Sequence, residues 1–230
     1  MESEVYEIAI QKAKTLMYEQ TIKNKAPSWL LTELTQEVGA ELSEKFNVNK
    51  NIVLLTLYLQ HLVFDPIVGG KIQSNHPELS AKYVTDNNLL EKWNIPLNDR
   101  SIIIEAIKSH HKKNKSENLI VEVIKNAECQ KFVTVKGALI WLHELGLRGY
   151  DFEKAKELVF YKMNQKKSLL TLEECKKIGE INCNNIIKLF NDKDMKLKLF
   201  KLHSLGLRNI EFKQAIKESD LLNVISINCI

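Results

Sequence analysis

The chain has 230 residues, of which 44% are hydrophobic, and a formal net charge of +4. This apolar fraction excludes a disordered protein. The small positive charge argues against nucleic acid as a partner, because charge-driven binders carry a denser basic stripe. The N-terminus is acidic where a signal peptide is basic, and no apolar run approaches the roughly 18 residues of a membrane span. We therefore expect a cytoplasmic protein that does not associate with a membrane.

Apolar residues recur at helical spacing along most of the chain, and the few Gly and Pro residues separate the periodic segments. Asn49 is placed to cap a very apolar helix up to Phe64, which we expect to be the most buried helix of the fold. The other predicted helices cover residues 4–22, 28–42, 77–92, 99–112, 117–132, 134–145, 151–165, 171–191, 193–204 and 210–223. No segment alternates with the period of a strand, so the predicted fold class is all-α.

We expect two parts, a helical domain over residues 1–132 and a C-terminal helical extension over residues 133–230 packed on it. The two parts form either separate domains or one continuous domain.

A seven-residue pattern occurs twice, as LHELGLR at residues 142–148 and as LHSLGLR at residues 202–208. We interpret each copy as a helix corner whose glycine, Gly146 or Gly206, takes the left-handed conformation. Asp151 and Asn209 are then available to cap the next helices. The alternative is that the histidine and arginine of each copy form a ligand-binding pair.

The central part of the chain contains an ordered series of short motifs. Residues 57–84 read LYLQHLVFDPIVGGKIQSNHPELSAKYV, IIIEAIKSHH ends at residue 111, and VEVIKNAEC covers residues 121–129. This order resembles the HD superfamily of metal-dependent phosphohydrolases over about residues 27–132. The resemblance implies an HD-like helical bundle in which imidazoles and carboxylates from several helices hold one or two divalent metals. Such metals activate water and neutralise a phosphoryl oxygen.

The motif that names this superfamily is incomplete in the chain. Its His-Asp dipeptide corresponds to Gln60-His61 or, after a shift of one residue, to His61-Leu62. An earlier ligand histidine is replaced within residues 29–33, and Glu128 stands where the superfamily has a late aspartate. His76 and His110 are the two residues that match expected ligand positions without substitution.

The resemblance therefore suggests an altered set of metal ligands, which consists of His61, His76, His110, Asp65 and Glu128. Each has a structural alternative: a histidine bonded to a carbonyl, a cap at His76 or Asp65, and an ordinary helix residue at Glu128.

The basic segment His111, Lys112 and Lys113 could hold a substrate phosphate, or simply offset a helix dipole. We expect His61, His76 and His110 to line one cavity and His111 to point away, because helix neighbours diverge by about 100°.

The predicted function is that of an HD-like protein with a degenerate metal site. It would bind a small phosphate-containing ligand or a partner protein, with little or no catalysis, because a required aspartate is missing. Its cofactor, if it has one, is a divalent metal: Mn, Fe, Co, Ni, Zn or Mg. Two alternatives stay open, a metal-dependent phosphohydrolase acting on a nucleotide or related phosphate ester, and a helical adaptor. The sequence also leaves a homo-oligomer open.

Overall fold

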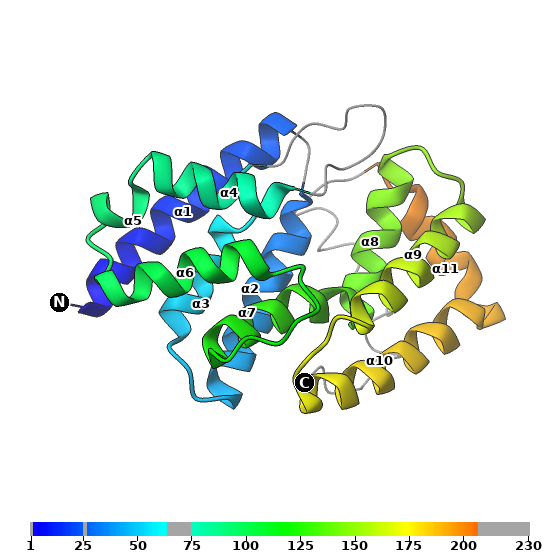
Figure 1. Cartoon of the computed structure of the whole chain (residues 1–230). Helices are drawn as coiled ribbons and strands as arrows, with labels where there is room; N and C mark the ends of the chain where they lie inside the picture. Colours follow the sequence, from blue (N-terminus) through cyan, green and yellow to red (C-terminus); the bar gives the residue numbers. More distant parts are fainter. Residues whose placement is uncertain (1, 25–26, 64–74, 207–230) are drawn as a thin grey trace. The chain divides into compact units, whose positions relative to one another are not determined.

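A computed structural model describes residues 2–24, 27–63 and 75–206, and every regular element in these ranges is a helix (Figure 1). The all-α prediction is confirmed. The chain divides into an N-terminal unit, residues 1–128, and a C-terminal unit, residues 129–230. The division lies four residues before the boundary expected from the sequence. Each helix in the described ranges is too short or too polar to cross a membrane.

The N-terminal unit contains α1 (Glu2–Asn24), α2 (Trp29–Lys45), α3 (Lys50–Leu59), α4 (His76–Asp86), α5 (Leu89–Lys92), α6 (Leu97–Ser109) and most of α7 (Leu119–Gln130). Helix α3 packs against α1, α2, α4 and α6. Seven of its ten residues are buried, as its apolar sequence predicts. The side chain of Asn49 accepts hydrogen bonds from the backbone N–H groups of Asn51 and Ile52, which confirms the predicted cap.

Helix α3 ends at Leu59, earlier than the predicted end at Phe64. The backbone N–H of Leu62 bonds to the carbonyl of Leu59, which makes a turn, and the N–H of Val63 bonds to the hydroxyl of Ser80 on α4. These bonds lead the chain out of the helix and hold its end against α4. His61 therefore lies in a turn, beside the start of α4.

The predicted helix over residues 77–92 is divided into α4 and α5. Asn88, between them, adopts the left-handed conformation with φ 51°. Asparagine tolerates this region better than most residues, because its short polar side chain can bond locally. The apolar spacing continues across the break, so periodicity alone does not reveal it.

The C-terminal unit contains η1 (Lys131–Val133), α8 (Val135–Leu147), α9 (Phe152–Lys167), α10 (Glu173–Asn191) and α11 (Lys193–Ser204). Helix α8 packs against η1, α9, α10 and α11. The side chain of Asp151 caps α9 by accepting from the N–H of Lys154, as predicted. Asn209 and the helix predicted over residues 210–223 lie outside the described residues.

The first copy of the LHxLGLR pattern meets the described part of the second, residues 202–206, where α8 packs against α11. His143 Nδ1 bonds to the carbonyl of Leu202 (3.2 Å), and His203 Nε2 bonds to the carbonyl of Tyr150 (3.0 Å). The prediction that Gly146 adopts the left-handed conformation is wrong, because this residue lies inside α8. The residue with a positive φ is Gly149, at 85°. A Cβ on Gly146 would lie 2.1 Å from the backbone oxygen of His203, so this glycine permits close helix contact.

Candidate metal centre

Four of the six histidines of the chain converge in the N-terminal unit. One ring nitrogen from each of His61, His76, His110 and His111 can be chosen so that all four atoms lie within 4.8 Å of one another. The ring centroid of His61 lies 5.2 Å from that of His76 and 5.1 Å from that of His110. The structure therefore brings together His61, His76 and His110, the three histidines that the sequence places in one site.

These histidines come from three chain segments that the helix packing holds together. His61 follows α3, His76 is the first residue of α4, and His110 and His111 follow the last residue of α6. Helix α4 packs against both α3 and α6, and α3 packs against α6. The C-terminal ends of α3 and α6 and the N-terminal end of α4 therefore bring the four imidazoles together.

The cluster lies largely out of contact with solvent. His61, His76 and His110 are 6%, 4% and 1% exposed, whereas the His111 side chain is 35% exposed. Burial, followed by the neighbouring His111, lowers the pKa of His110 well below its ordinary value of 6.5, although Glu128 opposes this effect. The His110 ring is therefore neutral near pH 7, which is the form that coordinates a metal.

Hydrogen bonds fix which nitrogen of His110 faces the cluster. His110 Nδ1 lies 2.7 Å from the carbonyl oxygen of Ile107, which can only accept, so we assign the proton to Nδ1. The Nε2 of the neutral ring is then unprotonated and accepts a hydrogen bond of 3.2 Å from Nε2 of His76, so a bound metal would replace the proton between the two rings. A backbone carbonyl that orients a histidine in this way is a common partner of metal-bound imidazoles.

The carboxylate of Glu128 lies beside the four histidines and is 3% exposed. Its Oε1 is 3.9 Å from Nε2 of both His61 and His111. Its Oε2 accepts a hydrogen bond of 2.9 Å from Nε2 of Gln60, a side chain with no exposed surface. The amide of Gln60, the residue before His61, thus orients this carboxylate. No local sequence pattern predicts that contact, because Gln60 and Glu128 are 68 positions apart.

The position of His111 differs from the prediction. We expected it to point away from His110, yet its ring centroid lies 4.7 Å from that of His76 and 4.3 Å from that of His110. The expectation assumed a helix through residue 112, but α6 ends at Ser109, and the N–H of Lys112 closes a turn onto its carbonyl. The 100° rule does not apply beyond the helix end, so both histidines face the cluster.

The remaining candidates are placed as follows. Lys112 and Lys113 follow His111 directly and are exposed. Asp65 lies outside the described residues.

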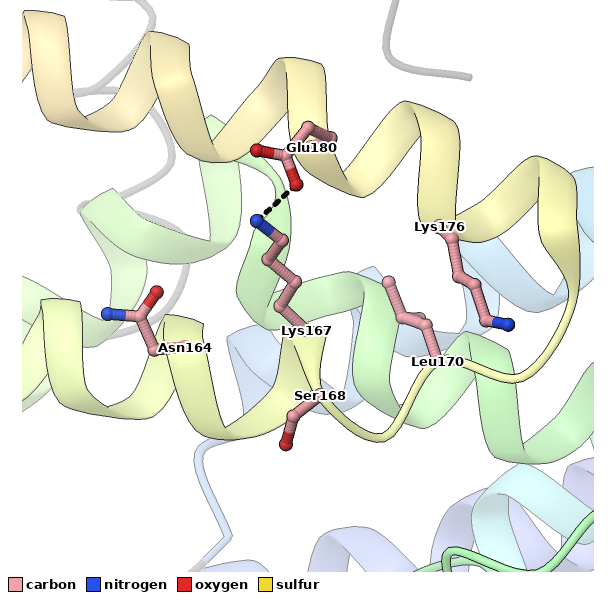
Figure 2. Close-up of a pocket in the computed structure, with 6 residues that line it drawn as sticks. All are labelled: Asn164, Lys167, Ser168, Leu170, Lys176 and Glu180. Atoms are coloured by element: carbon pink, nitrogen blue, oxygen red, sulfur yellow. Dashed lines mark ion pairs between the residues drawn. The ribbon is translucent and has the colours of Figure 1, made fainter.

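A surface pocket in the C-terminal unit offers a less specific arrangement. Figure 2 shows its lining residues on α9, on α10 and in the turn between them: Asn164, Lys167, Ser168, Leu170, Lys176 and Glu180. Lys167 pairs with Glu180, and Lys176 pairs with Glu173. Each lysine is thus matched by a carboxylate, so the pocket has no clear preference for an anion or a cation.

Comparison with known proteins identifies no relative. No family model, no curated protein and no solved structure matches the chain. The geometry of the histidine cluster therefore has to support any functional assignment by itself.

Proposed function

We propose that the protein is an HD-like metal-binding protein whose four-histidine centre holds one divalent transition metal. The observation that carries the proposal is the convergence of ligand atoms from His61, His76, His110 and His111 within 4.8 Å. A single buried histidine is usually a structural residue, bonded to a carbonyl. His143 and His203 in this chain are of that kind. Ring nitrogens from four imidazoles that converge on one point are instead typical of a metal centre.

The spacing of the cluster suits a small cation. Metal–nitrogen bonds of about 2.0–2.1 Å place two tetrahedral ligands roughly 3.4 Å apart. The Nε2 atoms of His76 and His110 are already 3.2 Å apart, whereas other pairs of the cluster extend to at most 4.8 Å. Binding therefore requires side-chain movements on the order of 1 Å.

The donor type narrows the choice of metal. Imidazole suits Zn, Fe, Co and Ni, whereas Mg prefers oxygen ligands. Of the metals considered from the sequence, Zn, Fe, Co and Ni therefore fit best. Paired metals are commonly joined by shared carboxylates. The donors here are mainly imidazoles rather than carboxylates, which favours one metal over two.

The exposed side of the centre supports a phosphate-containing ligand. His111 is partly exposed, and Lys112 and Lys113 follow it on the surface. Cations beside a metal site attract an anion, and a phosphoryl oxygen is a suitable additional ligand. Little catalysis is expected, because Gln60 and Leu62 cannot replace the aspartate of the HD motif.

A second candidate is a metal-dependent phosphohydrolase. The observation in its favour is the buried Glu128 carboxylate, 3.9 Å from a ring nitrogen of His61 and from one of His111. A carboxylate at such a place can accept a proton from an attacking water.

Metal content and metal titration test the proposal. We expect the purified protein to contain about one equivalent of transition metal, and the chelator-stripped protein to bind one Zn²⁺ or Co²⁺. His61→Ala, His76→Ala and His110→Ala should each weaken binding. His143→Ala is the matched control, because that buried histidine lies in the other unit. Absence of binding by the wild type, or equal binding by the triple variant, would refute the proposal.

An activity panel separates the two candidates. Nucleoside mono-, di- and triphosphates are incubated with Mn, Co, Ni or Mg and the wild type or a His61→Ala/His110→Ala variant. Negligible turnover by both is the expected result. Robust turnover that disappears in the variant would favour the phosphohydrolase.

A further inference from the structure

We propose that a buried ion pair on α7, between Lys125 and Glu122, positions His111 for metal binding. This inference rests on the proposed metal-binding function. The connection between α6 and α7 begins with His110 and His111 and continues to Asn118, just before α7. The same helix α7 carries Glu128 at the histidine cluster. Helix α7 is therefore in a position to fix both the carboxylate and the segment that carries the fourth histidine.

The ion pair is fully enclosed by protein. Lys125 and Glu122 are each 1% exposed, and Lys125 Nζ lies 2.6 Å from Glu122 Oε1. A buried lysine–glutamate pair rarely stabilises a fold more than apolar side chains of the same size would. A stabilising role therefore does not account for the pair, and the remaining bonds of the two side chains suggest another.

Both charged groups hold the backbone of the segment that follows His111. Lys125 Nζ donates to the carbonyl of Asn114 (2.5 Å), and Glu122 Oε1 accepts from the N–H of Ser116 (2.8 Å). The hydroxyl of Ser116 in turn donates to Glu105 of α6. The ion pair thus binds the otherwise exposed connection at two backbone groups, the carbonyl of Asn114 and the N–H of Ser116.

The position of His111 depends on these backbone hydrogen bonds more than the positions of the other three histidines do. His61 and His76 are buried next to helix ends, and His110 is bonded to a carbonyl of its own helix. His111 lies beyond the end of α6, and its side chain is 35% exposed. Its backbone is held on one side by the turn at Ser109 and on the other by the ion pair acting through Asn114. Lys125 and Glu122 are therefore positioning residues for the exposed ligand.

The test compares metal binding by variants of the full chain. The main variant is Glu122→Leu/Lys125→Met, because removing both charges avoids an uncompensated buried charge. Lys115→Met is the matched control, since Lys115 is an exposed lysine of the same connection. His111→Ala provides the reference for a centre without the fourth histidine. The readouts are the Kd for Zn²⁺, the absorption spectrum of bound Co²⁺, and helix content by circular dichroism.

We expect the double variant to keep its helix content and to bind Zn²⁺ about 10–100-fold more weakly, as is typical for the loss of outer partners of a ligand. Its Co²⁺ spectrum should match that of His111→Ala. Adding His111→Ala to the double variant should cause no further loss. Lys115→Met should behave as the wild type does.

A double variant with the affinity and spectrum of the wild type would overturn the inference. Additive losses on combination with His111→Ala would also overturn it, because the pair would then act independently of His111. Should the double variant unfold, Ser116→Pro replaces it, because this change removes the N–H bonded to Glu122 without altering a residue of α7. Ser116→Ala is its control, since it removes the hydroxyl bonds to Glu105 and Asn118 and keeps that N–H. The same two outcomes decide. A wild type that binds no metal would instead refute the proposed function, and this inference with it.

Discussion

Zinc should raise the melting temperature of the metal-free protein by a predictable amount. A ligand that binds only the folded state stabilises it by RT ln(1 + [L]/Kd), which is about 4.1 kcal/mol at a free concentration 1,000-fold above Kd. The four histidines all belong to the N-terminal unit, residues 1–128. An unfolding entropy of about 2.1 cal/mol/K per residue gives about 0.27 kcal/mol/K for a unit of this size. The expected increase is therefore about 15 °C.

Differential scanning calorimetry of chelator-stripped protein measures this increase, with Zn²⁺ held at a buffered free concentration. Mg²⁺ at the same concentration should leave the melting temperature unchanged, because imidazole is a poor ligand for it. His110→Ala should abolish most of the increase. His143→Ala should lower the starting stability and keep the increase, because its buried ring bonds to Leu202 in the other unit. An increase below about 2 °C with Zn²⁺, or an equal increase in His110→Ala, would refute this reasoning.

Three further predictions follow from individual residues. Gly146→Ala should destabilise the protein by about 1–3 kcal/mol in urea unfolding, because the new Cβ would lie against the backbone oxygen of His203; unchanged stability would contradict the close contact. In the metal-free protein, burial keeps the pKa of His110 below the value of 6.5, so the unfolded state binds the proton more readily. The contribution of neutral His110 to the free energy of unfolding should be fully present above pH 6.5. As the pH falls below 6.5, the free energy of unfolding should decrease by at most about 1.4 kcal/mol per pH unit, until the pH reaches the folded-state pKa. Urea unfolding across pH should show this slope in the wild type and not in His110→Ala. Glu128→Gln should weaken Zn²⁺ binding by about tenfold or more in a chelator competition titration, because it removes the negative charge beside the cation; wild-type affinity would exclude that role.

The fold was largely predictable because its helices are long and strongly periodic. Asn49 and Asp151 marked helix starts through cap chemistry that acts within three residues. The errors occurred at helix ends, where periodicity carries little information. Asn88 adopts the left-handed conformation and separates α4 from α5 within the predicted range 77–92. The apolar spacing continues past this residue, so the pattern does not predict the break.

The candidate site was predictable to the extent that it depended on the order of histidines along the chain. His61, His76 and His110 meet as expected, because their helices pack against one another. The inward position of His111 depends on α6 ending at Ser109. The sequence pattern predicted that this helix ends three residues later. The contact between Gln60 and Glu128 joins residues 68 positions apart, and neither side chain carries a local signal of it.

A metal shared by His61 and His76 would act as a crosslink between residues only fifteen positions apart. Closing a loop of that length corresponds to about 3 kcal/mol in a chain-entropy treatment. Each doubling of the number of residues between two linked positions changes this entropy by only about 0.6 kcal/mol, so the contribution of the crosslink depends little on the length of this interval. The length of the interval from His76 to His110 is set by the helix packing, because α4 and α6 within it pack against each other. A search for related metal centres should therefore keep the second interval constant and allow the first to vary.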